Sequence, residues 1–183
     1  MEINQKYFEL FGLKESYDLD VHELRGFYQE LQLKFHPDRY VDASDAEQRL
    51  SVQYTSYIND AYETLRNPLP RAMYMLQLMG VDFEHETTIR DSDFLIQQMH
   101  LREQLEGVRQ HARPDDALQQ FLEHVRRELR QLETDFGDIA NVEETEEEVE
   151  LDLVEAEQVV RKMQFLSKLE KEAVKLESEL FDY

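Results

Sequence analysis

The sequence predicts an all-α protein made of two helical parts. Apolar residues recur every three or four positions along most of the 183 residues, which is the period of a helix with one buried face. No segment has the strict alternation of a half-buried strand. Proline and glycine interrupt the helical pattern at only a few places. We therefore expect an N-terminal helical hairpin with short accessory helices, followed by a C-terminal antiparallel three-helix bundle.

The N-terminal part is expected to hold four helices, whose ends are marked by capping residues, prolines and glycines. We place them at Tyr7–Phe11, Asp20–Phe35, Ser44–Asn67 and Pro70–Gly80. Asp20 and Ser44 can each cap a long helix. Glu23 and Glu47 stand three residues later, where a glutamate completes a capping box.

Each of the two long helices carries one apolar stripe. The stripes consist of Val21, Leu24, Tyr28, Leu31 and Phe35 in one helix, and of Leu50, Tyr54, Ile58, Ala61 and Leu65 in the other. Such stripes pack against each other in an antiparallel pair.

The tripeptide His36-Pro37-Asp38 separates these two helices. Pro37 cannot continue a helix, and it biases His36 away from helical geometry. The tripeptide is therefore predicted to lie at the exposed tip of the pair. Any proline can end a helix, so taken alone the tripeptide does not distinguish a functional loop from an ordinary one.

The C-terminal part is expected to be three long helices with short connections. Residues 1–76 form the first domain, 77–91 a polar connecting segment, and 92–183 the bundle. The bundle helices are placed at about 92–110, from Pro114 onward, and at about 149–181. Their core stripes include Leu118, Phe121, Leu122, Val125, Leu129 and Leu132 in the second helix, and Leu166, Leu169, Ala173, Leu176 and Leu180 in the third.

The first bundle helix has two apolar faces. Its core stripe consists of Phe94, Leu101, Leu105 and Val108, whereas the opposite side carries Leu95, Ile96, Met99 and Glu103. A bundle helix needs only one apolar face, and exposed apolar patches commonly bind partners. The alternative is that another helix or the first domain covers this face. Phe165 either extends the same patch or is an ordinary core phenylalanine.

Composition excludes several classes of function. The chain has no cysteine, hence no disulfide and no thiolate metal site. Its six histidines show no ligand spacing, so neither an enzyme nor a metal protein is favoured. The net charge of −21 argues against nucleic-acid or anionic-membrane binding. The acidic run 143–148 is expected to be a solvated loop or helix start, with a basic partner as the alternative. No signal peptide or membrane span is predicted, and we expect a cytoplasmic protein.

Two runs in the first part resemble the J-domain, the module by which J-proteins act on 70-kDa heat-shock ATPases. They are Phe27–Tyr40, which contains the tripeptide, and Ile58–Pro68. Their order and spacing both fit, over roughly the first 76 residues. The resemblance implies that Asp38 engages a basic residue of the ATPase while His36 and Pro37 fix the loop.

The whole chain resembles the HscB family of iron–sulfur cluster co-chaperones, through the segments Arg66–Ala72, Arg90–Leu95, Leu101–Glu103 and Val160–Leu166. The resemblance implies that the J-domain stimulates a dedicated HscA-like ATPase and that the bundle binds an IscU-like cluster scaffold. It implies neither catalysis nor a resident cofactor in this chain. The scaffold contacts carried over are Leu95, Ile96, Met99, Glu103 and Phe165. His100 and Gly107 depart from the family pattern, because relatives can carry acidic contact residues there.

The second predicted helix also departs from general J-domains. Gln29, Glu30 and Gln32 stand where basic residues are common, and the basic residues that remain are Arg25, Lys34 and Arg39. This thinner basic face is expected to suit a specialised ATPase. The chain lacks the cysteine-bearing zinc segment of some eukaryotic members, so a bacterial-type member is expected. The alternative function is a J-domain adaptor for a different client protein.

Overall fold

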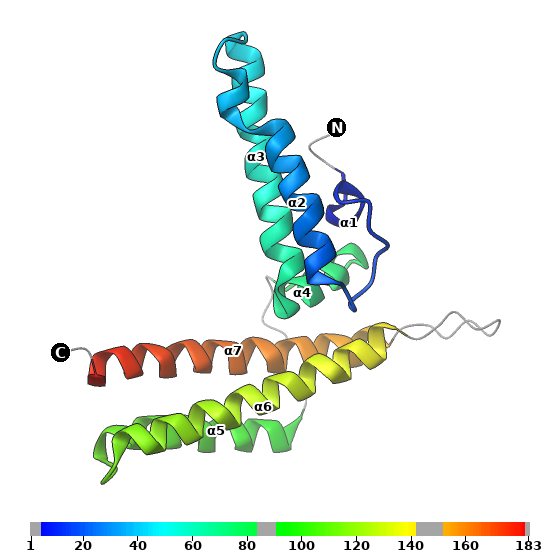
Figure 1. Ribbon diagram of the computed structural model, residues 1–183. Helices are drawn as coiled ribbons and strands as arrows, with labels where there is room; N and C mark the ends of the chain where they lie inside the picture. Colours follow the sequence, from blue (N-terminus) through cyan, green and yellow to red (C-terminus); the bar gives the residue numbers. More distant parts are fainter. Residues whose placement is uncertain (1–4, 84–90, 142–151, 182–183) are drawn as a thin grey trace. The chain divides into compact units, whose positions relative to one another are not determined.

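The computed structural model describes residues 5–83, 91–141 and 152–181, and every regular element within these ranges is helical (Figure 1). The chain divides into two compact units, Met1–Leu78 and Met79–Tyr183, each with its own core. The all-α fold class predicted from the sequence is confirmed. The predicted start of the last helix at Val149, the acidic run 143–148 and residues 84–90 of the connecting segment lie outside the described residues.

The first unit is built on a pair of antiparallel helices. Its elements are α1 (Tyr7–Leu10), α2 (Val21–Phe35), the short 3₁₀ helix η1 (Pro37–Tyr40), α3 (Asp45–Arg66) and α4 (Pro68–Leu78). Helices α2 and α3 lie side by side along their length, and α1 and α4 pack at the end opposite the tip (Figure 1). Their fully buried side chains include Phe8, Leu24, Ile58, Leu65 and Leu76.

The helix ends follow the capping signals with two differences. Asp20 accepts hydrogen bonds from two backbone N–H groups of α2, and Ser44 forms a complete capping box with Glu47. Among the described residues, Glu23 gives no matching return bond. Helix α4 begins at Pro68 rather than Pro70, because proline is well suited to the first helical position and the first α4 bond runs to the carbonyl of Asn67.

Two residues of the predicted hairpin stripes are exposed instead of buried, Val21 and Leu50. Val21 is the first residue of α2, at the edge of the packed region. The Thr55 hydroxyl donates to the Phe35 carbonyl, so position 55 of α3 is level with the last residue of α2. Leu50 therefore lies roughly 7 Å closer to the tip, beyond the end of α2, at 1.5 Å per residue.

The second unit consists of α5 (Ser92–Gly107), the 3₁₀ turn η2 (Val108–Gln110), α6 (Pro114–Ala140) and α7 (Leu153–Phe181). Helices α6 and α7 pack along their length, and α5 contacts both (Figure 1). Their shared core contains Leu101, Val108, Leu118, Phe121, Leu122, Val125, Leu166, Leu169, Ala173 and Leu176. No described helix is long and apolar enough to cross a membrane.

Candidate functional site

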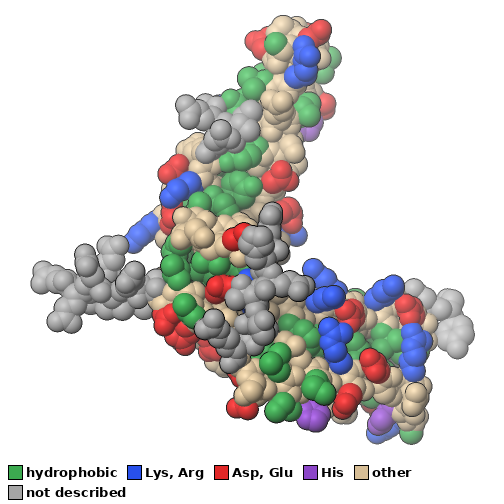
Figure 2. Space-filling view, turned by 180° about the vertical axis from the view of Figure 1, so that it is seen from behind, with side chains coloured by type: hydrophobic (Ala, Val, Ile, Leu, Met, Phe, Trp, Pro, Cys, Tyr) green, Lys and Arg blue, Asp and Glu red, His purple; other side chains and the backbone are tan. Residues whose placement is uncertain are grey.

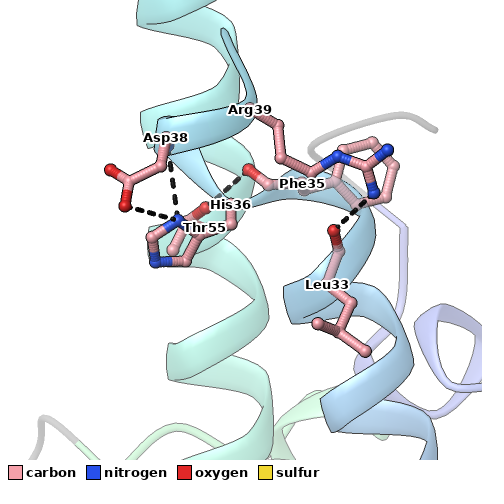
Figure 3. A network of polar contacts seen from close by, with 6 residues as sticks. All are labelled: Leu33, Phe35, His36, Asp38, Arg39 and Thr55. Carbon is pink, nitrogen blue, oxygen red and sulfur yellow. Dashed lines mark hydrogen bonds and ion pairs between the residues drawn. The ribbon is translucent and has the colours of Figure 1, made fainter. Parts of the chain in front are cut away.

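The His-Pro-Asp tripeptide forms a tight turn at the tip of the first unit (Figure 3). Helix α2 ends at Phe35, whose carbonyl accepts a hydrogen bond from the Thr55 hydroxyl of α3 at 3.1 Å. His36 has an extended backbone with φ −57° and ψ 130°, and Pro37 then begins η1. The residue before a proline avoids helical geometry, which explains why the helix stops here. The sequence-predicted position of the turn is confirmed.

The imidazole of His36 organises this turn. Its Nδ1 accepts a hydrogen bond from the backbone N–H of Asp38 at 3.3 Å, and it lies 3.7 Å from the Asp38 carboxylate. The backbone bond needs the Nδ1 lone pair and so belongs to the neutral ring, whereas an ion pair needs the protonated ring. The Asp38 side chain itself is 87% exposed. A negative charge is thus presented to solvent on a backbone that the histidine helps to hold.

Arg39 closes the C-terminal end of α2. Its guanidinium donates to the carbonyl of Leu33 at 2.9 Å (Figure 3). Its backbone N–H donates to the carbonyl of His36 at 3.0 Å. The last carbonyls of a helix have no partner within the helix, and a cation near them is favourable. Arg39 therefore stabilises the turn in addition to bearing a charge beside it.

The other two basic residues singled out from the sequence are not gathered at the turn. Arg25 and Lys34 are nine positions apart in α2, which places them on opposite sides of the helix at 100° per residue. Lys34 lies over the ring of Phe35, with Nζ 5.3 Å from the ring centroid. Arg25 is roughly 16 Å along the helix from His36. Of the predicted residues, the structure thus joins His36, Pro37, Asp38 and Arg39 in one turn, while Lys34 lies in the last turn of α2 and Arg25 lies further along that helix.

A groove of about 540 Å³ runs beside the turn. It is lined by Tyr28, Gln29, Gln32, Leu33, His36 and Arg39. Leu33 is 72% exposed, although it is a large apolar residue beside the tripeptide. Sequence reasoning missed Leu33, although its position outside the α2 stripe was the available signal.

A second exposed surface lies on α5. Its apolar residues Leu95, Ile96 and Met99 are 42%, 55% and 64% exposed, while Phe94, Leu101 and Val108 are buried. The division of α5 into a core stripe and a second apolar face is therefore confirmed for the described residues. Figure 2 shows hydrophobic side chains exposed on the bundle next to charged side chains of both signs. We call Leu95, Ile96 and Met99 the α5 patch.

Phe165 of α7 lies between the core and this patch. It is half-buried against the bundle core, and its ring meets that of Phe94 edge-on at 5.8 Å. The guanidinium of Arg102 lies over the same ring, 5.4 Å from its centroid. Because Arg102 follows Met99 by three positions, it lies beside the patch on the helix surface. Phe165 is thus a core residue whose outer side reaches the edge of the α5 patch.

Charged and small residues border the patch further along α5. The Glu103 carboxylate is highly exposed and lies 3.8 Å from Nδ1 of the exposed His100. Gly107 ends the helix and lines a groove of about 580 Å³ with residues that include Val108 and Phe121. Glu103 stands four residues after Met99, so it places an exposed carboxylate one helical turn from the α5 patch.

Helix α5 is held in place at its start by Asp91. The carboxylate caps the helix by accepting from the N–H of Phe94 at 2.9 Å, and it also accepts from the ammonium group of Lys162 at 2.5 Å. The bond to Lys162 is the largest cause, and the bond to the backbone N–H the second, that lowers the pKa of Asp91 below its ordinary value.

Among the described residues, no three His, Asp or Glu side chains are grouped to hold a metal ion.

A helical hairpin that presents His36-Pro37-Asp38, followed by a three-helix bundle, is the arrangement of a J-domain co-chaperone. Comparisons with known proteins agree with this class. The family model described as the HSCB C-terminal oligomerisation domain matches residues 90–174. Co-chaperone protein HscB homologs from Shewanella halifaxensis and Shewanella pealeana are 41% and 40% identical to this chain, each over 96% of it and 99% of the relative.

Solved structures show the same similarity. HscB from Vibrio cholerae has a TM-score of 0.82 and 36% identity, covering 97% of this chain and 100% of that one. Human HscB has a TM-score of 0.80 and 27% identity, covering 97% of this chain and 84% of the human one. The chain belongs to the HscB family of co-chaperones.

Proposed function

We propose that this protein is a co-chaperone of iron–sulfur cluster assembly that links a cluster scaffold to an ATP-driven chaperone. In this proposal residues 1–76 form a J-domain that stimulates ATP hydrolysis by an HscA-like ATPase. Residues 92–183 bind an IscU-like scaffold, and 77–91 connect the two. The protein acts in the cytoplasm without catalytic residues or a cofactor of its own, and it binds neither nucleic acid nor membrane.

The observation that carries this proposal is that one chain, which aligns with HscB relatives over 96% of its length, has two separate exposed surfaces suited to partners. One surface is the turn that presents Asp38, and the other is the α5 patch. A carboxylate on a fixed turn is suited to pair with a basic group of a partner. An exposed patch that contains methionine is suited to an adaptable apolar contact.

The division of work follows from the chemistry of each surface. The α5 patch, with Glu103 and the outer side of Phe165, holds the scaffold. Asp38 engages a basic residue of the ATP-bound chaperone, and His36, Pro37 and Arg39 hold the turn in the shape that this contact requires. Arg25 and Lys34 add longer-range attraction on either side of α2. Hydrolysis in the chaperone then traps the scaffold that the bundle has delivered.

An ATPase assay with three purified proteins tests the proposal. We expect the intact chain to raise the ATPase rate of the HscA-like chaperone, and we expect an IscU-like scaffold to raise it further. A pull-down should retain the scaffold on the wild-type chain and lose it on the Met99→Asp variant. No stimulation of the ATPase would overturn the chaperone role, and no retention of the scaffold would overturn the scaffold role.

A J-domain adaptor for a different client is the second candidate. The observation that favours it is the exposure of His100 and Gly107 beside the patch, since both depart from the acidic pattern of relatives. That alternative predicts that the chain stimulates the ATPase in the assay but does not retain the scaffold in the pull-down.

A further inference from the structure

The groove of about 580 Å³ on the α6 side of α5 combines an apolar floor with two histidines. Eight residues from α5, η2, α6 and the turn between them line it: Gln104, Gly107, Val108, His111, Ala117, Gln120, Phe121 and His124. We infer that this groove binds the C-terminal residues of a partner chain, with the last side chain on the apolar floor and the terminal carboxylate at the two imidazoles.

This groove is separate from the α5 patch. Successive residues of a helix differ by 100°, so Gln104 lies roughly 140° around α5 from Met99. That is the side away from Arg102, whose guanidinium lies over Phe165 of α7. No residue of the α5 patch lines the groove. The inference therefore does not rest on the scaffold role, and it is tested without the scaffold.

The floor of the groove is apolar and open at Gly107. Val108 and Phe121 belong to the bundle core and are 3% and 5% exposed. Gly107 contributes no side chain above them, and a Cβ placed there would meet no atom within 4 Å. An apolar side chain of a ligand can therefore lie against Val108 and Phe121, where it leaves water.

The length of the groove matches a short extended peptide. One wall is formed by α6 between Ala117 and His124. Seven helical steps of 1.5 Å make this wall roughly 10 Å long. An extended chain covers about 3.3–3.6 Å per residue, so about three residues fill the groove. A single amino acid would leave most of it empty.

Hydrogen bonding makes the free ring nitrogen of His124 a donor. Its Nδ1 lies 2.8 Å from a guanidinium nitrogen of Arg127. A guanidinium can only donate, so Nδ1 accepts and the proton of the neutral ring is on Nε2. Among the described residues, no hydrogen bond engages this Nε2 and no carboxylate forms an ion pair with Arg127. An anion bound at Nε2 is also attracted by the guanidinium beside the ring.

His111 supplies a second ring nitrogen to the same groove. Its Nδ1 lies 3.3 Å from the backbone nitrogen of Arg113 and 3.2 Å from the carbonyl oxygen of that residue. When Nδ1 accepts from the backbone N–H, the proton of the neutral ring is on Nε2. The two oxygens of a carboxylate can then accept one bond from each histidine.

Charge and composition favour an anionic chain end over other ligands. None of the eight lining residues is acidic, although the chain contains 41 acidic residues, so no side chain of the lining repels a carboxylate. A C-terminal residue carries an apolar side chain and a carboxylate on the same Cα, whereas an Asp or Glu side chain ends in the carboxylate alone. The amides of Gln104 and Gln120 can bond the last peptide groups of the ligand.

An NMR titration of the isotope-labelled full-length chain tests this inference. The probe is the hexapeptide Ser-Gly-Ser-Gly-Leu-Phe with an acetylated N-terminus and a free C-terminal carboxylate. We expect it to shift the backbone amide signals of Gly107, His111 and His124. The same peptide with a C-terminal amide should bind about tenfold more weakly, because the charge-assisted hydrogen bonds are lost. N-acetylphenylalanine should also bind about tenfold more weakly, because it fills only part of the groove.

Two variants locate the binding in the groove. His124→Phe keeps an aromatic ring but loses Nε2, so it should weaken binding of the free-acid peptide about fivefold and leave binding of the amidated peptide nearly unchanged. Gly107→Leu fills open space in the groove and should weaken binding about tenfold or more without lowering the melting temperature, since leucine favours helix over glycine. Gly26→Leu is the matched control, because a Cβ on this residue of α2 also meets no atom within 4 Å, and it should bind as the wild type does.

Four results would overturn the inference. The first is no binding of the hexapeptide, and the second is equal affinity for its free-acid and amidated forms. Equal affinity for N-acetylphenylalanine and the hexapeptide would assign the groove to a small carboxylic acid in place of a chain end. A Gly107→Leu protein with wild-type melting temperature and wild-type affinity would place the binding elsewhere. The scaffold role would stand in each case, because the ATPase assay and the pull-down test it separately.

Discussion

The carboxylate of Asp91 joins two helices of the bundle, because it caps α5 and accepts a hydrogen bond from Lys162 of α7. Lys162 also lies over the ring of Phe94, with Nζ 5.3 Å from the centroid. Phe94 in turn contacts Phe165. The start of α5, which carries the α5 patch, is therefore fixed to α7 by a charge pair and a pair of rings together.

This arrangement predicts an acid-dependent contribution to stability. The pKa of Asp91 is lower in the folded protein than its ordinary value of 3.8, because Lys162 and the N–H of Phe94 favour the charged form. A lowered pKa stabilises the fold above the unfolded-state pKa, and that stabilisation is lost as the pH falls through the folded-state value. Asp91→Asn should therefore lower the melting temperature at pH 7, and its difference from wild type should shrink below about pH 4.

Asp93→Asn is the matched control, because Asp93 is an exposed acidic residue of the same helical turn. Melting curves of the three proteins from pH 7 to pH 3 make the comparison. A difference between Asp91→Asn and wild type that stays constant across this range would show that the contribution of Asp91 to stability does not depend on its ionisation.

Local signals in the sequence account for most of the fold. Ser44 and Glu47 mark the start of α3 through bonds between neighbouring residues, Pro68 separates α3 from α4, and Gly80 follows α4 with a φ of 88° that favours glycine. The α5 patch was predictable for the same reason, since Leu95 and Met99 fall opposite the core stripe by helical periodicity alone. Leu50 was predicted wrongly because its burial depends on where α2 ends, which periodicity within α3 does not contain.

Contacts between distant residues were not predictable. The guanidinium of Arg102 over Phe165 joins residues 63 positions apart, and the pair of Asp91 and Lys162 joins residues 71 apart. Both depend on the rotation and offset of α5 against α7. The hydrogen bond from Arg39 to the carbonyl of Leu33 spans only six positions, but it depends on the fold of the turn. The sequence predicted Arg39 as a charge, not as a helix cap.

Asp38→Asn should abolish stimulation of the ATPase with almost no change in melting temperature. The substitution keeps the shape of a side chain that is almost fully exposed, and it removes the charge that a basic partner site requires. Asp42→Asn, an exposed change just after η1, should stimulate as the wild type does. Steady-state ATPase rates at saturating co-chaperone decide the matter. Full stimulation by Asp38→Asn would contradict the role of the turn.

Arg39→Met should reduce both the stability of the first unit and its ATPase stimulation. The variant keeps the aliphatic stem but loses the hydrogen bond to Leu33, which is worth about 0.5–1 kcal/mol at an exposed site. Arg49→Met is a matched control, because Arg49 also donates to a helix carbonyl, that of Asp45, but it does so within α3 and does not bond to the turn. Urea unfolding and ATPase rates should show similar losses of stability for both variants and lost stimulation for Arg39→Met alone.

Residues 1–78, the first compact unit, should stimulate the ATPase weakly when expressed alone. The fragment keeps the turn and all of α4, but it lacks the α5 patch. Added scaffold should therefore give no further increase, whereas it should with the intact chain. The ATPase rate measured against scaffold concentration for both proteins tests this. A fragment that responds to scaffold as the intact chain does would mean that the bundle is not the scaffold-binding part.

Met99→Asp separates a binding role of the α5 patch from a structural one. Met99 is 64% exposed, so a charge there should lower the stability by no more than about 1 kcal/mol, from helix propensity and repulsion by Glu103. Loss of a central apolar contact should weaken scaffold binding by ~2 kcal/mol or more. If the face were instead covered, the buried unpaired charge would destabilise the fold by several kcal/mol. Thermal unfolding and scaffold titration of the same samples distinguish the two cases.

Two further variants complete the comparison. Val154→Asp makes the same chemical change at a residue of α7 that is 65% exposed and outside the patch, so it should leave scaffold binding intact. Glu103→Lys reverses a charge beside the patch, and its effect on binding should fall as salt is raised, because salt screens exposed charges. The loss caused by Met99→Asp should persist at high salt, since removal of an apolar contact is not screened. A Met99→Asp protein with a much lower melting temperature would indicate that this face is buried in the folded protein. The position of the scaffold site would then be unknown.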